Sequence, residues 1–285
     1  MSFSPAYTIH QYREDIFKVV AFKGNRNPDV MYVRDREEQR HNDVKLDSNF
    51  SRARSMVLQY ALCNPWEYFF TGTLDRLKFD RYDLDTFANR LMQFIRDKRK
   101  KYNAKFQVLL VPERHKDGAW HIHGLVHGLP ETVLTSFAPP APKTLIEHGF
   151  LNWPDYMDKF GFCSLAPIRD PVATAFYITK YVSKDLSRRS ADLGKHLYFH
   201  SRPLQKAVKA SDVYYYNFQL DKFCTEDYDF CKTGMVEDAP WYFPYVWDGA
   251  DMYVEPLEPK PMEKAPTSFR PQEIDPFYEQ MKIEL

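Results

Sequence analysis

The chain has 285 residues, of which 44% are hydrophobic and 16% aromatic, so it can bury a sizeable core. Its formal net charge is zero, but residues 1–220 hold 33 Lys and Arg against 24 Asp and Glu, whereas residues 221–285 hold 6 against 15. No run approaches ~18 apolar residues and no signal-peptide pattern is present, which argues against membrane insertion and predicts a cytoplasmic protein. The basic part favours a polyanionic partner; the acidic part can shield that surface, bind a protein or simply be solvated.

Composition also divides the chain into three parts. Residues 1–48 are polar and of mixed charge, and we expect an arm with one short strand near Phe17–Phe22. Residues 49–220 hold most of the periodic patterns and form the predicted domain, and residues 221–285 form an acidic, Pro-rich extension. The four cysteines form no CxxC pair, which predicts free thiols in a reducing compartment.

The predicted domain opens with a helix over residues 50–63, where apolar residues recur at helical spacing until Asn64-Pro65 ends it. Arg52 and Arg54 lie outside the apolar stripe of this helix and can contact a polyanion. A strand of β-forming residues follows.

Two threonines share one face of that strand, which is predicted over residues 66–74. Alternation along the strand places Thr71 and Thr73 on the same side. Their hydroxyl groups can bond phosphate oxygens, but threonine is also common in strands because of its shape alone. Both interpretations stay open.

The next predicted element is an amphipathic helix over residues 83–102 with an aromatic and aliphatic stripe. Its last turn carries four consecutive basic residues: Lys98, Arg99, Lys100 and Lys101. Positive charge there suits the helix dipole, which is one interpretation. Four basic residues exceed what that role needs, so contact with phosphate groups is the second interpretation.

A β-hairpin is predicted over residues 105–126, with Asp117-Gly118 as its turn signal. Alternate residues of a strand share a face, so His121 and His123 point the same way. A tight turn would place Glu113 across from His121. Two imidazoles and one carboxylate on one patch of sheet can hold a divalent cation and leave positions open for a substrate.

By itself the histidine pair favours two structural histidines. The register of Glu113 and a second polar stripe further along the chain raise the metal-site interpretation above that alternative. His115 and His127 lack a comparable context, so we leave them out of the predicted site.

The second polar stripe lies on a helix predicted from Asp170-Pro171, an N-cap and a first helical residue, to about Ser187. Four residues at helical spacing form one face of this helix: Tyr177, Lys180, Tyr181 and Lys184. A phenol with a pKa near ~10 is a poor nucleophile until its anion is stabilised, which a neighbouring ammonium group can do. This face therefore predicts nucleophiles, and the alternative is an amphipathic surface helix with half-buried tyrosines.

The remaining predicted elements are a short helix over residues 131–137 and strands over residues 162–168, 197–200 and 213–218.

Three motifs in this order resemble the HUH endonucleases, specifically the two-tyrosine rolling-circle replication initiators of single-stranded DNA phages and plasmids. The motifs are Phe70–Leu74, Trp120–Gly124 and Tyr177–Lys184, and the resemblance spans roughly residues 50–220. It implies an α+β fold in which a central antiparallel sheet of about five strands is flanked by helices, similar to ferredoxin or RNA-recognition folds. It further implies that His121, His123 and a third ligand, carried onto Glu113, bind Mg²⁺ or Mn²⁺.

The implied activity is nicking and rejoining of single-stranded origin DNA, extended or folded as a hairpin, which starts rolling-circle replication. Tyr177 and Tyr181 would attack in turn, each giving a 5′-phosphotyrosine link and a free 3′-OH, with Lys180 and Lys184 beside them. The two threonines, Arg52, Arg54 and the basic helix end would contact the DNA. The sequence has no GxxxxGK[ST] motif, so unwinding and synthesis would need a helicase and a polymerase of the bacterial host.

Two further classes compete with this interpretation. One is a relaxase or a single-strand transposase of the same superfamily, and the other is a catalytically silent protein that binds an origin. A nucleotide hydrolase with alternating histidines would need a third histidine where Leu125 stands, so we set it aside.

Overall fold

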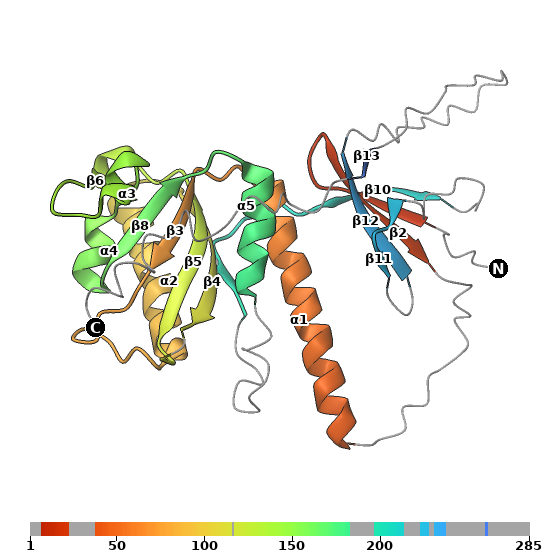
Figure 1. Cartoon of the computed structure of the whole chain (residues 1–285), viewed down its shortest axis with the longest axis horizontal. Coiled ribbons are helices and arrows are strands. Elements are labelled where there is room, and N and C mark those ends of the chain that lie inside the picture. The colour runs from red at the N-terminus through yellow and green to blue at the C-terminus, as the bar shows by residue number, and fades with distance from the viewer. Residues whose placement is uncertain are drawn as a thin grey trace. The chain divides into compact units, whose positions relative to one another are not determined.

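The computed structural model describes residues 7–22, 38–115, 117–182, 197–213, 223–227, 231–237 and 260–261 (Figure 1). The chain forms two compact units, one from residues 1–35 and 206–265 and the other from residues 36–205 and 266–285. Each unit contains an antiparallel sheet, and several helices accompany them, so the fold class is α+β as predicted. Among the described residues, no helix combines the length and the hydrophobicity that crossing a bilayer requires.

The larger unit contains a seven-stranded antiparallel sheet in the order β6-β7-β8-β3-β5-β4-β9. The resemblance implied about five strands. Three of the seven observed strands are only two residues long, and of these β9 lies within the strand predicted over residues 197–200. The strands are β3 Tyr68–Gly72, β4 Gln107–Arg114, β5 Trp120–His127, β6 Thr135–Ser136, β7 Leu151–Asn152, β8 Cys163–Pro167 and β9 Phe199–His200.

The helices of this unit begin at recognisable caps. Asp83 accepts a hydrogen bond from the backbone N–H of Thr86, and Asp170 accepts one from that of Ala173. The helix predicted over residues 131–137 is wrong in extent, because a single turn there is followed by β6. The helical segments are α1 Glu38–Cys63, α2 Leu84–Lys101, η1 Glu131–Val133, α3 Lys143–Glu147, α4 Pro154–Lys159, α5 Pro171–Ile178 and η2 Thr179–Tyr181.

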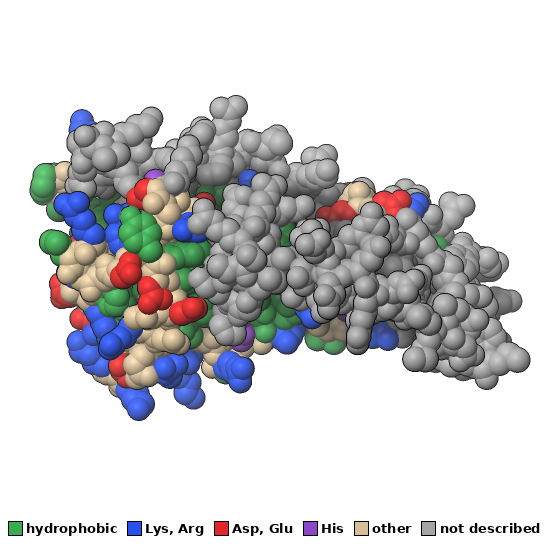
Figure 2. All heavy atoms as spheres, turned by 90° about the horizontal axis from the view of Figure 1, so that it is seen from below, with side chains coloured by type: hydrophobic (Ala, Val, Ile, Leu, Met, Phe, Trp, Pro, Cys, Tyr) green, Lys and Arg blue, Asp and Glu red, His purple; other side chains and the backbone are tan. Residues whose placement is uncertain are grey.

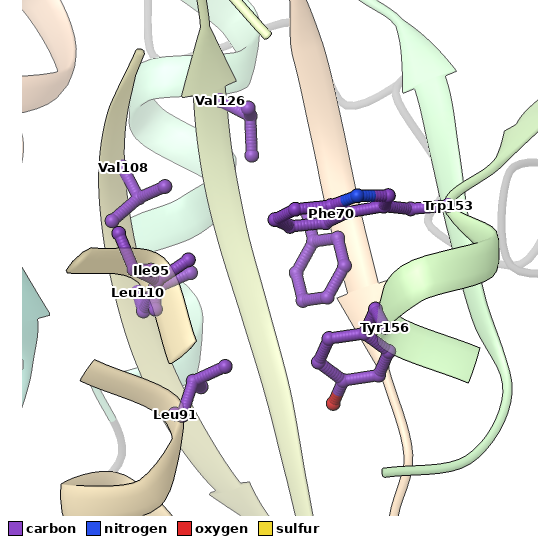
Figure 3. A pocket seen from close by; sticks show the side chains of 8 residues that line it. All are labelled: Phe70, Leu91, Ile95, Val108, Leu110, Val126, Trp153 and Tyr156. Carbon is purple, nitrogen blue, oxygen red and sulfur yellow. The ribbon is translucent and has the colours of Figure 1, made fainter. Parts of the chain in front are cut away.

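One face of the seven-stranded sheet packs against α2 and α4. Phe94 of α2 lies against the rings of Trp153, Tyr156 and Phe160, with centroid separations of 5.1–6.3 Å. Eight side chains of this layer, shown in Figure 3, line a void of about 10 Å³, which is room for one water molecule at most. This face is therefore a filled core and offers no ligand site.

The other face of the sheet lies toward α1 and α5. Leu109 and Val111 of β4 point to this side and are fully buried, as is Ile178 of α5. Because strand residues alternate, the residues between them belong to the opposite core. On the strands, Glu113, His121 and His123 of the predicted site lie on the same face of the sheet as Leu109.

The smaller unit contains a six-stranded antiparallel sheet, in which β10-β1-β2-β12-β11 are consecutive neighbours and β13 also pairs with β12. Of the sequence predictions, the strand near Phe17–Phe22 is confirmed, whereas residues 214–218 of the strand predicted over residues 213–218 lie outside the described residues, and residue 213 ends β10. In this sheet β2, from the predicted arm of residues 1–48, pairs with β12, from the predicted extension of residues 221–285. The strands are β1 Tyr7–Gln11, β2 Ile16–Phe22, β10 Val208–Val213, β11 Glu226–Asp227, β12 Cys231–Glu237 and β13 Lys260–Pro261.

Candidate functional site

The β4–β5 hairpin has the register that the sequence predicts. Glu113 is the cross-strand partner of His121, and Gly118 makes the turn with φ of +89°. The Asp117 carboxylate accepts a hydrogen bond from the backbone N–H of Ala119, 2.9 Å away, which fixes the turn. His121 and His123 consequently lie with Glu113 on the side of the sheet that faces α5.

His123 is the most enclosed residue of the site, with 2% of its surface exposed. Its Nε2 atom lies 2.8 Å from an oxygen of Glu113, and its Nδ1 atom lies 3.4 Å from the hydroxyl of Thr71 on the neighbouring strand. Burial raises the pKa of Glu113, but the hydrogen bond from His123 and the positive potential of the nearby imidazoles outweigh it, so this pKa lies below its usual range. The carboxylate is thereby held as an anion.

His121 has a different neighbour, His115, whose ring stacks on it with centroids 5.2 Å apart. Burial lowers the pKa of His121 to about 4, with further contributions from His123, His115 and Arg81. The prediction left His115 out of the site, although it follows Glu113 by two residues and so continues its strand parity. That parity was the signal that could have found it.

The tyrosine helix brings both phenols to the histidines. Tyr181 stacks on His123, with ring centroids 3.8 Å apart and an angle of 17° between the rings. The hydroxyl groups of Tyr177 and Tyr181 form a hydrogen bond, and Phe69 of β3 lies 5.4 Å from the Tyr177 ring. The two histidines and the two tyrosines, which lie 54 to 60 positions apart in the sequence, therefore belong to one cluster.

The helix itself ends earlier than predicted. Regular α-helix stops at Ile178, and a 3₁₀ turn covers residues 179–181. The hydroxyl of Thr179 donates to the carbonyl of Phe176, 2.6 Å away, and this local bond competes with the α-helical pattern. Residues 183–187 of the predicted helix, including Lys184, lie outside the described residues.

Lys180 remains beside the tyrosines after this change of helix type. Its side chain is exposed, and its Nζ atom lies 5.4 Å from the centroid of the Tyr177 ring. An ammonium group at this place stabilises negative charge on the phenol electrostatically.

The two threonines of β3 have different surroundings. Thr71 pairs in register with His123 and is 8% exposed. The hydroxyl of Thr73 donates to the carbonyl of Phe162 at 3.1 Å, a bond that ties β3 to β8. Between them, a Cβ atom on Gly72 would lie 2.5 Å from the Tyr156 hydroxyl, so a residue without a side chain makes room for the core here.

The donor set of two imidazoles and one carboxylate suits Mn²⁺ or Mg²⁺ chemically. Glu113 and His123 already share a hydrogen bond, and burial keeps His121 neutral, as a ligand must be. Among the described residues, no group of three His, Cys, Asp or Glu side chains is placed to hold a metal ion as it stands. Binding of a cation would therefore require the hydrogen bond between Glu113 and His123 to open.

Of the predicted DNA contacts, Thr71 lies in this cluster, whereas the basic end of α2 lies apart from it. Arg52 and Arg54 are exposed on α1. Arg99 donates to the carbonyl of Phe106, which precedes β4, whereas Glu113 lies near the other end of that strand, about 23 Å away at ~3.3 Å per residue. The basic helix end thus lies at the opposite edge of the sheet from the histidines.

Two lysines of that helix end also have an intramolecular partner. Lys98 and Lys101 both pair with Asp155 of α4, and the Tyr102 hydroxyl donates to the same carboxylate. These contacts give the basic turn a structural role, and Lys100 remains an exposed basic side chain.

Residues 67–186 match a family model of replication-associated proteins, the ORF2 type. The matched span contains β3, the β4–β5 hairpin and α5, and therefore every residue of the cluster described above. Comparison with curated proteins and with solved structures gave no match. The family match connects this part of the chain with DNA replication.

Proposed function

From the match to a replication-associated family, we propose that the chain nicks and rejoins single-stranded origin DNA and thereby starts rolling-circle replication. The reaction is a transesterification with a 5′-phosphotyrosine intermediate. Helicase and polymerase activities would come from the host, in the cytoplasm of a bacterial cell.

One observation carries this proposal: the two tyrosine hydroxyls meet beside the histidine pair. Tyr181 stacks on His123 at 3.8 Å, and Tyr177 shares a hydrogen bond with Tyr181. If the two tyrosines had only a structural role, burial of their rings would be enough, yet their hydroxyls also meet on the polar side of the sheet. Paired hydroxyls beside two imidazoles and a carboxylate are the parts that phosphoryl transfer to a tyrosine requires.

In the proposed reaction, the oxygen of one tyrosine loses its proton and attacks the scissile phosphorus in line. A new bond from the tyrosine oxygen to phosphorus forms as the bond from phosphorus to the 3′-oxygen breaks. The 3′-oxygen keeps the bonding electrons and takes up a proton. One phosphate diester replaces another, so the second tyrosine or the released 3′-OH can reverse or repeat the exchange.

The residues of the cluster support each part of the proposed reaction. The hydrogen bond between Tyr177 and Tyr181 lets one hydroxyl stabilise the anion of the other, and the Lys180 ammonium adds positive charge nearby. His121, His123 and Glu113 would hold Mg²⁺ or Mn²⁺, which would polarise the phosphate and neutralise its developing charge. Thr71 orients His123 through its hydroxyl, and Lys184 would contribute a second ammonium group.

A catalytically silent origin-binding protein is the second candidate, and one observation favours it. Glu113 is bonded to His123, and no described group of three ligands is in place for a metal ion. Such a protein would bind origin DNA without cleaving it. A relaxase or a single-strand transposase would share the chemistry proposed here and differ only in its DNA.

The test is a gel assay for a covalent adduct between protein and DNA. Single-stranded DNA tiled across the protein's own replicon is incubated with the wild type, Tyr177→Phe, Tyr181→Phe and the double variant, in Mn²⁺ or in EDTA. We expect a metal-dependent adduct that survives in at least one single variant and is lost in the double variant. Tyr198→Phe is the matched control, since this half-buried tyrosine packs on Tyr60 and His200 instead.

Adduct formation by the double variant would refute the two-tyrosine mechanism. Tight binding of one tile with no adduct from any tile would establish the silent alternative.

A further inference from the structure

The segment between β3 and α2 presents an exposed aromatic side chain beside the hairpin turn. Tyr82 has 59% of its surface exposed, which is unusual for a large ring among the residues that the structure describes. Figure 1 shows the β4–β5 turn and the segment after β3 at the same lower end of the sheet. A ring held in solvent next to a candidate site needs an explanation other than the core.

The backbone beneath this ring is firmly held. The backbone N–H of Trp120 donates to the carbonyl of Arg81 at 2.9 Å, and the Trp120 indole N–H donates to the carbonyl of Tyr82 at 3.1 Å. The backbone N–H of Tyr82 donates to Asp80 at 2.9 Å. Trp120 directly precedes His121, so the exposed ring is anchored to the strand that carries both histidines.

Gly118 lies between this ring and a basic side chain, both within van der Waals distance of the place that its Cβ atom would take. A Cβ atom on Gly118 would lie 3.6 Å from the ring of Tyr82 and 3.5 Å from a terminal nitrogen of Arg114. The Arg114 guanidinium lies 5.7 Å from the centroid of the Trp120 ring, and its Nε donates to the carbonyl of Gly118. A ring and a guanidinium group therefore flank a residue without a side chain.

The charges around Gly118 are compatible with a phosphate group. Asp117 pairs with Arg81 and with His115, at 3.3 Å in both cases. In the described part of the chain, no carboxylate lies within salt-bridge distance of Arg114. Figure 2 looks at the molecule from below and shows Lys and Arg side chains among Asp, Glu and apolar side chains on the part of this face that is described.

We propose that Tyr82, Gly118 and Arg114 form a subsite for one unpaired nucleotide of the DNA strand, with the base stacked on Tyr82 and its phosphate on Arg114. This proposal rests on the proposed function for the identity of the ligand. Stacking on an aromatic ring tolerates every base, because every base has a π-face. Arg114 and Trp120 pair across the hairpin next to Glu113 and His121, and because strand residues alternate they point to the opposite face of the sheet. The subsite would therefore hold a nucleotide outside the histidine cluster.

The test uses the full-length protein in EDTA, where no cleavage occurs, and two fluorescein-labelled probes: a dT 12-mer and its abasic counterpart with the same phosphates. Fluorescence anisotropy gives the dissociation constant of each probe. We expect Tyr82→Ala to weaken binding of the dT probe about tenfold. Tyr82→Phe and Leu77→Ala should change it less than about twofold, because the first keeps a ring and the second removes an exposed side chain of the same segment.

The abasic probe separates stacking from a general loss of structure. Removal of the bases should weaken binding to the wild type by a similar factor, and Tyr82→Ala should weaken the abasic probe no further. Arg114→Gln should reduce the salt dependence of binding by about one phosphate contact. Wild-type affinity of Tyr82→Ala for the dT probe would overturn the subsite, as would an equal loss with both probes.

These outcomes are independent of the nicking chemistry. If stacking is found but no tile of the replicon yields an adduct, the subsite stands and the nuclease falls. If an adduct forms and Tyr82→Ala binds dT normally, the nuclease stands and the subsite falls.

Discussion

The two faces of the seven-stranded sheet are built from the same strands but carry different chemistry. Toward α2 and α4, the side chains of β4 and β5 join a buried aromatic and aliphatic core. Toward α5, alternate residues of the same strands are Glu113, His121 and His123, and the facing helix adds Tyr177 and Tyr181. On β5, His121 and His123 thus alternate with Trp120 and Ile122, whereas on β4 the apolar Leu109 and Val111 share the face of Glu113.

This difference shows how a polar cluster can be buried without a loss of order. His123 can be 2% exposed because Ile122, beside it, is held on the other side by a close-packed core. The apolar face supplies the stability, and the polar face supplies the candidate chemistry. Substitutions on the two faces should accordingly change different observables.

The largest effect on stability is expected from Phe94→Ala. This ring contacts three other aromatic residues of the core, and its loss should lower the free energy of unfolding by about 3–5 kcal/mol. Urea denaturation followed by circular dichroism measures the change. Asn89→Ala, an exposed position of the same helix, should stay within about 0.5 kcal/mol, and equal losses in both variants would contradict the assignment of this face as the core.

On the polar face, His123→Ala should weaken Mn²⁺ binding at least about tenfold, because a ligand is removed. Isothermal titration calorimetry with Mn²⁺ measures this directly. His127→Ala is the matched control, since His127 has the same strand parity but lies at the other end of β5, near Glu67. Unchanged Mn²⁺ affinity in His123→Ala, with the fold intact, would remove this histidine from the proposed metal site.

The register of the hairpin could be predicted from sequence because local residues set it. Asp117-Gly118 fixes the turn, and strand alternation then places Glu113 opposite His121. The meeting of the tyrosines with the histidines could be inferred only from the resemblance, since no local rule brings α5 onto β5. The 3₁₀ turn at residues 179–181 depends on a side-chain hydrogen bond of Thr179 that propensity does not reveal.

The second sheet could not be predicted for a related reason. β2 pairs with β12 in a register that joins Phe17 to Val236, more than 200 residues apart in sequence. Nothing in either strand specifies a partner so distant. Alternation reveals which residues face a core, but it leaves the identity of the neighbouring strand open.

The helix layer of the apolar face gives a pH prediction. Hydrogen bonds from Lys98 and Tyr102 lower the pKa of Asp155 to about 2, below the ~3.9 of an unfolded aspartate. A carboxylate whose folded pKa is lowered stabilises the fold fully above the unfolded pKa and loses this effect as the pH falls through the folded pKa. Asp155→Asn should therefore cost about 1–2 kcal/mol at pH 7, after allowance for solvent screening, and the difference should shrink between about pH 5 and pH 2.

Denaturation midpoints measured across this pH range would show the trend. Asp158→Asn, an exposed position of the same helix, should leave the pH dependence of stability unchanged. A gap between wild type and Asp155→Asn that persists at pH 2 would exclude the ion pairs with Lys98 and Lys101 as its cause. The basic end of α2 would then be available for DNA, and the contrast between the two faces would weaken.

The smallest effect is expected from Thr71→Val, which tests whether a polar-face hydroxyl acts through its neighbour. The variant keeps a branched side chain in β3 but removes the oxygen 3.4 Å from His123, so the imidazole loses a partner that fixes its orientation. We expect Mn²⁺ affinity to fall a few-fold while stability changes by about 0.5–1.5 kcal/mol. Thr174→Val removes a hydrogen bond to the Asp170 carbonyl at the start of α5 and should change stability by a similar amount without changing Mn²⁺ affinity. If both variants altered Mn²⁺ affinity equally, the effect of Thr71 would be one of general stability, and the polar face would be less independent of the core than its geometry indicates.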